Sequence, residues 1–241
     1  MGDQQDAGIN ALQLPGAITY AFLPHTPHSQ SQARAAHHLG KEVMLHLPMQ
    51  AMSSNQLLGP GGLTLEMGRK QFGNTFRADL ASVPYVVGIN NHMGSLLTRH
   101  PGHMKWLMEE IKQQRGLYFI DSRTTHHTVA RKVASELQIP SRQRDVFLDD
   151  DPSPTAITHQ FERLISKARL QGSAIGIGHP YTSTISVLRK LLPRLKQENI
   201  ELVPVSQLVP RKTTTRLAAE TPETSTPGPL VLSQPIHLNK H

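Results

Sequence analysis

The chain has 241 residues, of which 37% are hydrophobic, so it can form one large domain or two small ones and is not wholly disordered. It contains no cysteine, which excludes disulfides, thiolate metal sites and a cysteine nucleophile. The formal net charge is +7, but the basic residues are dispersed and only 5% of residues are aromatic, so we expect no nucleic-acid partner. No apolar run is long enough for a membrane span, and the polar N-terminus does not resemble a signal peptide.

Short apolar runs alternate along the chain with segments of helical periodicity. The runs are apolar on both faces and several end at Pro, Gly or a polar residue, as is typical of strands buried on both faces of a parallel sheet. They are Ala17–Leu23, Val43–Pro48, Tyr85–Ile89, Leu117–Ile120, Asp145–Leu148, Ala174–Ile177 and Ile200–Val205. This alternation predicts right-handed crossovers and an α/β architecture.

Helical spacing is clearest in three segments. Met104–Gln114 places apolar residues at i, i+3, i+4 and i+7, which predicts a helix with one buried face. The same spacing predicts helices over Thr158–Leu170 and Ile185–Lys196. Residues suited to helix C-caps follow the three segments: Gly116, Gly172 and Asn199.

Seven strands are one fewer than a closed (β/α) barrel usually holds. The chain also begins with a helix-like segment, Gln4–Leu14, with no strand before it. A missing first strand explains both observations and predicts an irregular (β/α) barrel, although an open, doubly wound sheet fits the same pattern. We assign the α/β domain to residues 1–210 and predict a disordered tail over residues 211–241, which are rich in Thr, Pro and Ser.

Chemically useful side chains follow six of the seven predicted strands. They are His25, His46, Asn90, Asn91, His92, Asp121, Asp149, Asp150, Asp151 and His179. Because ligands gather at the carboxyl ends of parallel strands, these positions predict a shared site. Histidines and carboxylates from separate strands can hold a divalent metal that activates water. His92 and His179 are the strongest candidates, because each ends an apolar strand in a glycine-containing turn; histidines that only hydrogen-bond the turn backbone fit equally well.

A glycine-rich loop over residues 59–65 precedes Glu66. The loop is too long for a plain connection, so it predicts either a substrate cradle that includes Glu66 or an ordinary surface excursion. No Gly-Lys-Ser/Thr follows it, which excludes a phosphate loop, and the chain contains no G-x-S-x-G motif of a serine hydrolase.

Seven segments in order resemble the divergent polysaccharide deacetylases of bacteria. They are LPGAITYAFLPHTPHS, EVMLHLPMQAM, GPGGLTLEM, GINNHMGSLLT, FIDSRTT, RDVFLDDD and AIGIGHPYTSTI, and the resemblance runs from about Leu14 to Val209. It implies an irregular (β/α) barrel that hydrolyses N- or O-acetyl groups of a polysaccharide with a divalent metal, zinc. It also implies a glycan as the partner and a periplasmic location.

The resemblance further implies roles for two histidines. In the wider superfamily an aspartate and two histidines hold the metal, a second aspartate is the general base, and a late histidine protonates the leaving amine. His92 matches a ligand histidine, whereas Leu96 stands where the second is usual. His179 matches the late position, where it is expected as a second metal ligand or as the general acid.

Five more residues complete the expected site. Asp121 and Asp149 correspond to carboxylates that take part in catalysis by orienting the histidines. Substrate contacts are expected from His46, Glu66 and Asn91.

One departure from the family pattern bears on activity. The family's paired aspartates end the first strand, and Met1-Gly2 resembles the residues that follow that pair. We therefore expect the chain to lack this strand, both aspartates and any signal peptide. A lost general base costs about 10²–10⁴-fold in rate. Two functions stay open: a metal-dependent carbohydrate deacetylase impaired by this loss, and a catalytically inactive glycan-binding or scaffold protein of the same fold.

Overall fold

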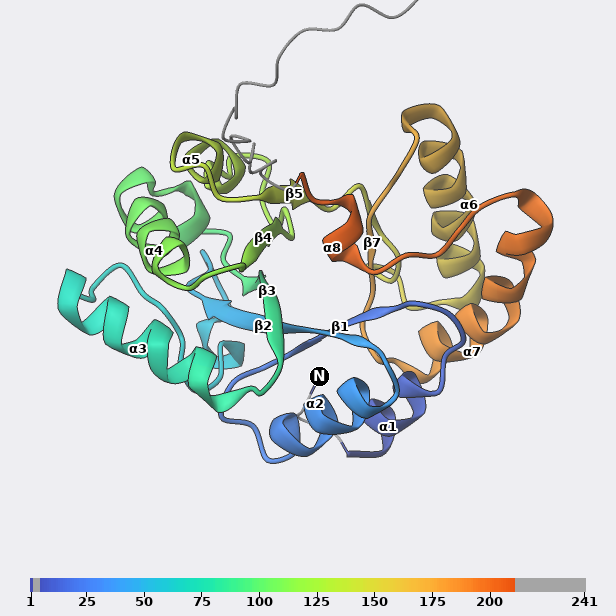
Figure 1. The fold of residues 1–241 in the computed structure, drawn as a ribbon, viewed down its shortest axis with the longest axis horizontal. Coiled ribbons are helices and arrows are strands. Elements are labelled where there is room, and N and C mark those ends of the chain that lie inside the picture. The colour runs from blue at the N-terminus through green and yellow to red at the C-terminus, as the bar shows by residue number, and fades with distance from the viewer. Residues whose placement is uncertain (2–4, 211–241) are drawn as a thin grey trace, which may run out of the picture. The chain divides into compact units, whose positions relative to one another are not determined.

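Parallel strands and their connecting helices make up the protein, in a computed structural model that describes residues 1 and 5–210 (Figure 1). Within that part of the chain, five strands pair in the order β1-β2-β3-β4-β5, and β6 pairs separately with β7. The strands are β1 (Thr19–Phe22), β2 (Glu42–Met49), β3 (Val86–Met93), β4 (Tyr118–Asp121), β5 (Ser141–Gln143), β6 (Val146–Phe147) and β7 (Gly176–Ile177). Every pairing is parallel, so the carboxyl ends of each sheet's strands meet at one edge.

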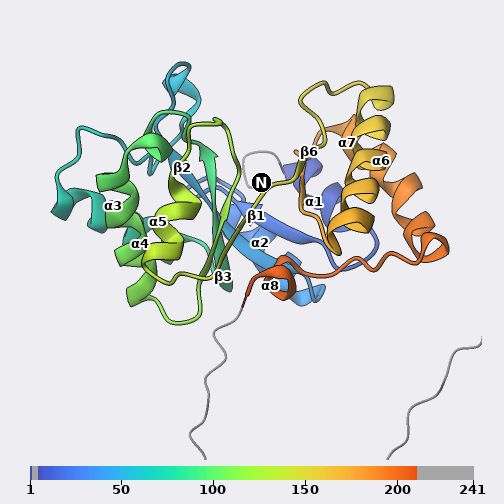
Figure 2. The ribbon, with the colours of Figure 1, turned by 90° about the horizontal axis from the view of Figure 1, so that it is seen from above.

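Helices connect the strands and cover the outer side of the sheets. They are α1 (Gln5–Leu12), α2 (Ser29–His38), α3 (Arg69–Ser82), α4 (Pro101–Gln113), α5 (Ala130–Glu136), α6 (Pro154–Gln171), α7 (Thr182–Leu191) and α8 (Val205–Leu208), with 3-10 turns at Asn55–Leu57, Leu97–Arg99 and Leu192–Glu198. Figure 2 shows α3, α4 and α5 beside the main sheet, and α6 and α7 on the opposite side, beside β6. None of the described helices has the length and apolar character needed to cross a bilayer.

The α/β class predicted from the sequence is confirmed, whereas a seven-stranded barrel is not. The main sheet contains five strands, and the last two described strands form a separate pair. One strand, β5, gives no signal in the sequence because its residues Ser-Arg-Gln are polar and only partly buried. The tail predicted for residues 211–241 lies outside the described residues, as do residues 2–4.

The strand predicted over Ile200–Val205 is wrong. Residues 200–204 are irregular, and α8 begins at Val205. Pro204 has no backbone N–H for a strand ladder. The next two amides donate instead to side chains of the main sheet: Val205 N to Thr19 Oγ1 at 3.0 Å and Ser206 N to Glu42 Oε1 at 3.1 Å. This apolar segment therefore packs across the sheet instead of extending it.

The three predicted helices are present, the third of them divided. The first corresponds to α4. The second corresponds to α6, which is capped at its start by the side chain of Ser153. Its C-cap residue is Gly172, which has a φ of 77°. The third prediction covers α7 and the 3-10 turn that follows it. Pro193 lies at the start of that turn, where its missing N–H ends the regular α-helix, and Asn199 closes the turn at a φ of 53°.

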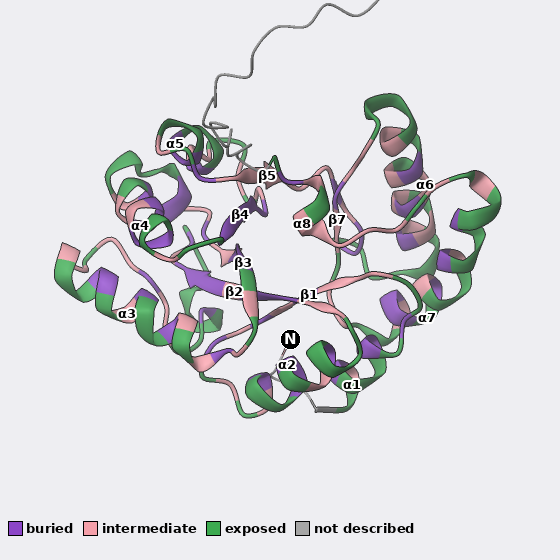
Figure 3. Ribbon diagram, in the orientation of Figure 1, coloured by how far each residue is buried: buried purple, intermediate pink, exposed green. Residues whose placement is uncertain are grey.

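Apolar residues on both faces of the strands form two core clusters. The larger one packs the outer face of the sheet against the helices and includes Leu45, Phe119 and Phe72, all fully buried. Figure 3 shows buried residues along the helix faces that turn towards the strands. On the other face, Met44 and Tyr118 pack in the smaller cluster, because successive residues of a strand point to opposite sides.

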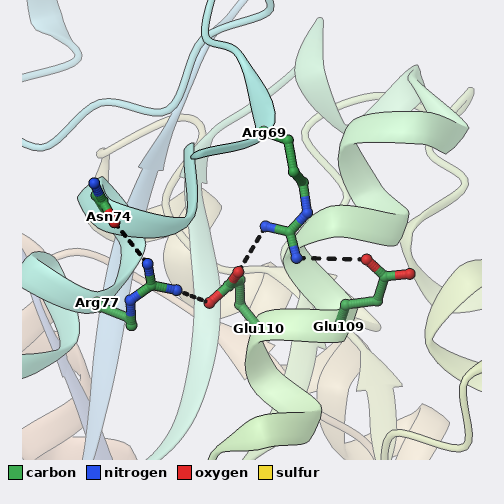
Figure 4. A network of polar contacts seen from close by, with 5 residues as sticks. All are labelled: Arg69, Asn74, Arg77, Glu109 and Glu110. Carbon is green, nitrogen blue, oxygen red and sulfur yellow. Dashed lines mark hydrogen bonds and ion pairs between the residues drawn. The ribbon is translucent and has the colours of Figure 1, made fainter. Parts of the chain in front are cut away.

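An ion-pair network joins α3 to α4, which flank β3 (Figure 4). The buried carboxylate of Glu110 accepts hydrogen bonds from Arg69 Nη1 at 2.6 Å and from Arg77 Nη1 at 2.5 Å. Arg69 also reaches Glu109 at 3.5 Å. A Cβ at Gly73 would lie 2.6 Å from Glu110 Oε1, so the absence of a side chain at Gly73 lets the carboxylate lie close to α3.

Candidate active site

Two histidines from neighbouring strands lie in contact at the carboxyl end of the main sheet. His92 Nδ1 in β3 is 3.2 Å from His46 Nε2 in β2, and the two ring centroids are 4.9 Å apart. His46 Nδ1 lies 3.0 Å from Asn90 Oδ1, and His92 Nε2 lies 3.3 Å from the carbonyl oxygen of Leu57. Both oxygens are acceptors, so in one tautomer assignment His46 donates from Nδ1 and His92 donates from Nε2. In that assignment His46 Nε2 and His92 Nδ1 carry no proton and face each other.

Electrostatics keep both imidazoles neutral. Burial lowers the pKa of His46 well below its ordinary value, and His92, the N-terminal ammonium and His179 lower it further. Burial also lowers the pKa of His92, and the ammonium and His179 act in the same direction. Neutral imidazole is the form that binds metal ions.

Met1 lies beside β1. Its ammonium donates to the carbonyl oxygen of Ala21 at 2.9 Å, and Leu23 N donates to the carbonyl oxygen of Met1 at 2.9 Å. These two hydrogen bonds place Met1 alongside the end of β1.

A second constellation lies at the ends of β6 and β7. Asp149, whose side chain is fully buried, accepts hydrogen bonds at Oδ2 from His179 N at 2.6 Å and from Thr184 Oγ1 at 2.8 Å. Its Oδ1 lies 3.1 Å from His179 Nδ1. The carboxylate therefore holds the ring with the proton on Nδ1 and leaves Nε2 able to accept or donate a proton. The structure thus brings Asp149 and His179, both predicted site residues, into contact.

Aromatic and basic side chains surround His179. Its ring centroid lies 5.4 Å from that of Phe147 and 5.2 Å from that of Tyr181. The guanidinium of Arg144 lies 4.9 Å from the Phe147 ring centroid and donates to the carbonyl oxygens of Ser122 and Arg123. Sequence reasoning missed Arg144, because it follows the polar strand β5, and missed Tyr181, because aromatic residues were not among the side chains sought at strand exits.

The side chains of Asp121 and Asn91 form hydrogen bonds with backbone groups around the site. Asp121 accepts from Arg123 N at 2.8 Å and from Thr128 Oγ1 at 2.9 Å, so it holds the turn after β4 instead of orienting a histidine. Burial raises its pKa. Asn91 accepts from Ser122 N at 2.8 Å and donates to the carbonyl oxygen of Met93 at 2.7 Å, which links β3 to β4.

Glu66 lies on the surface beyond the loop that follows β2. Its carboxylate accepts a hydrogen bond from Gln50 Nε2 at 3.3 Å. The glycine-rich loop returns to the sheet at Leu63, which bridges Met49. Earlier in the same connection, the carbonyl of Leu57 contacts His92. This connection therefore contacts His92 through Leu57, whereas Glu66 contacts Gln50.

The described residues contain no group of three or more His, Asp or Glu side chains placed to hold a metal ion. The expected ligands His92 and His179 are therefore not part of such a group among the described residues. His46 contacts His92 instead. The pair fits two positions of a metal site, and residues 1 and 5–210 do not supply the third.

The protein is thus an α/β protein in which histidine and aspartate side chains lie at the carboxyl ends of parallel strands. The chain matches the family model described as divergent polysaccharide deacetylase over residues 1–209, and it belongs to that family. It is 40% identical over 198 residues to the uncharacterized protein YibQ of Escherichia coli K12. The alignment covers 82% of this chain and 61% of YibQ, so the chain spans less than two thirds of that relative. An uncharacterized protein of Haemophilus influenzae is 38% identical over 205 residues, covering 85% of this chain and 71% of that protein.

Two solved structures share the fold. The uncharacterized protein ATU2773 from Agrobacterium tumefaciens C58 superposes with a TM-score of 0.83 at 24% identity, covering 87% of this chain and 85% of that chain. The lactam utilization protein from Thermus thermophilus superposes with a TM-score of 0.55 at 13% identity, covering 83% of this chain and 92% of that chain. At these identities the likeness concerns the fold alone.

Proposed function

We propose that the protein is a deacetylase that hydrolyses N- or O-acetyl groups of a bacterial polysaccharide, with a divalent cation, zinc, bound in part by His46 and His92. The observation that carries this proposal is the contact between His92 Nδ1 and His46 Nε2 at 3.2 Å. Both nitrogens are unprotonated when Asn90 and Leu57 accept from the other two ring nitrogens. Lone pairs at that separation repel each other unless a proton or a cation lies between them. Two nitrogens that bind one tetrahedral zinc at 2.0–2.1 Å are ~3.3–3.4 Å apart, so the observed separation suits two ligands of one ion.

A zinc ion in this position would supply Lewis-acid polarisation of the acetyl carbonyl. When Asn90 and Leu57 accept hydrogen bonds from the two rings, the chain presents both ligand nitrogens without a rearrangement.

The proposed proton carrier is His179. With Asp149 on Nδ1, its Nε2 can take a proton from the attacking water and return it to the amine or alcohol as the acetyl C–N or C–O bond breaks. The ring is 39% exposed, so substrate can reach it. Its electrostatic effect on the pKa of both His46 and His92 supports placing it in the same site. A periplasmic location is proposed with this function, because it follows from the kind of substrate.

Acetate release from the N-acetylglucosamine hexamer in the presence of zinc tests the proposal. We expect His92→Ala and His179→Ala each to lower the rate at least a hundredfold. The matched control is His100→Ala, which removes an exposed histidine at the start of α4 and should leave the rate unchanged. Equal rates for wild type and His92→Ala would contradict the proposal.

A second function, glycan binding without catalysis, is favoured by the missing third ligand among the described residues. Binding of the hexamer without acetate release, with or without zinc, would support it over the deacetylase.

A further inference from the structure

An exposed aromatic ring borders the proposed site. Tyr181 is 47% exposed, and its ring lies 5.2 Å from the His179 ring at an interplanar angle of 33°. His179 also meets the Phe147 ring, at 80° and 5.4 Å. Tyr181 is thus a solvent-exposed ring in contact with the proposed proton carrier.

Local stability does not explain a tyrosine at this position. Tyr181 is the N-cap residue of α7 and makes no side-chain hydrogen bond to the helix. Ser, Thr, Asp and Asn are preferred there, and a capping side chain is worth about 1 kcal/mol. The ring is also poorly buried, so it adds little to the core. Tyr181 therefore neither caps its helix nor packs in the core.

Apolar side chains are exposed on the other side of the site as well. Leu57 is 67% exposed and Met52 is 64% exposed, on the connection whose Leu57 carbonyl contacts His92. The proposed site therefore has exposed apolar surface beside each of its histidine constellations. Apolar surface with a few convergent polar groups is typical of ligand sites. Pyranose rings suit such a surface, because their C–H faces pack on aromatic rings while their hydroxyls stay hydrated.

We infer that Tyr181 is the platform on which a sugar ring next to the acetylated unit stacks, so that the site selects glycans of two or more units over a monosaccharide. Leu57 and Met52 contact the chain on the His92 side. The inference rests on the proposed function for the class of ligand, but it concerns chain-length selection and not the hydrolytic step.

The test compares Tyr181→Ala and Tyr181→Phe with Tyr85→Ala. Tyr85 is a matched control, because it is 42% exposed and its ring also stacks on a histidine, His37, at 3.8 Å. It precedes β3 and therefore lies at the opposite end of that strand from His92. Binding of N-acetylglucosamine and its hexamer is measured by titration calorimetry. An aromatic stacking contact accounts for about five- to tenfold in affinity.

We expect wild type to bind the hexamer more tightly than the monomer. Tyr181→Ala should weaken hexamer binding about five- to tenfold and leave monomer and zinc binding within about twofold, whereas Tyr181→Phe and Tyr85→Ala should match wild type. Undiminished hexamer binding by Tyr181→Ala, an equal loss in Tyr85→Ala, or no hexamer binding by wild type would each overturn the inference. Hexamer binding that depends on Tyr181 without acetate release would uphold it while the deacetylase proposal fails.

Discussion

Removing the Asp149 carboxylate should destabilise the protein, because buried donors depend on it. In Asp149→Ala, the backbone N–H of His179 and the hydroxyl of Thr184, which is 2% exposed, lose their shared acceptor. An unsatisfied buried donor costs about 1–3 kcal/mol. The His179 N–H is only partly buried and adds less, so the two together should cost about 1–4 kcal/mol. The His179 ring is 39% exposed and can bond to water, so its loss adds little.

Asp149→Asn should cost less, about 1 kcal/mol, since one amide oxygen can still accept both buried hydrogen bonds. The exposed neighbour Asp150 provides the matched control, and Asp150→Ala should change the free energy of unfolding by less than about 0.5 kcal/mol.

Urea unfolding measures these differences, with far-UV circular dichroism and the fluorescence of Trp106, the chain's single tryptophan, as probes. Equal m-values among the variants would show that the midpoints report stability. A cost below about 1 kcal/mol for Asp149→Ala would refute the reasoning, because it lies at the bottom of the range for even one unsatisfied donor. So would an equal loss in Asp150→Ala.

Two further predictions concern other buried carboxyl groups. Burial raises the pKa of Asp79 to about 8, well above its unfolded value, so the folded state keeps a proton that the unfolded chain loses. This contribution to stability is fully present below about pH 4, declines as the pH rises to about 8 and is constant above that. Asp79→Asn should flatten that decline in thermal melting measured from pH 4 to 9; an unchanged profile would show that Asp79 does not titrate as described. Glu110→Gln should lower the free energy of unfolding in urea by about 1–2 kcal/mol, because the two arginines lose a buried charged acceptor. Glu109→Gln, at a half-exposed pair, should cost less than about 0.5 kcal/mol, and equal costs would contradict the network's role.

The sequence predicts the order of strands and helices because most strands are buried on both faces and read as apolar runs. That signal fails in two places for opposite reasons. Ser141–Gln143 forms β5 with polar residues, since an edge strand needs only backbone partners on one side. Residues 200–205 are largely apolar but do not form a strand, because they pack across the sheet and include Pro204.

The sequence predicts which residues lie at the ends of the strands, but it does not predict which of their side chains contact one another. His46 pairs in register with Asn90, and His92 is two residues further along β3, so all three side chains point to one face. No sequence pattern gives that register. Asp121 and Asp149 both end strands, yet only Asp149 meets a histidine, because β6 pairs with the strand that leads to His179.

The contacts of the histidines bear on the expected division of roles. His46, expected at the substrate, contacts the expected ligand His92, and His179, expected as a metal ligand or as the general acid, is held by the Asp149 carboxylate. The reason is geometric: β2 and β3 are hydrogen-bonded neighbours, whereas His179 follows a strand of the separate pair.

Zinc titration by calorimetry is the sharpest check on metal binding by the histidine pair, because it requires no substrate. We expect one zinc per chain, with affinity at least tenfold lower in His46→Ala and in His92→Ala and unchanged in His100→Ala. Absence of zinc binding by the wild type, or binding that survives both substitutions, would contradict it.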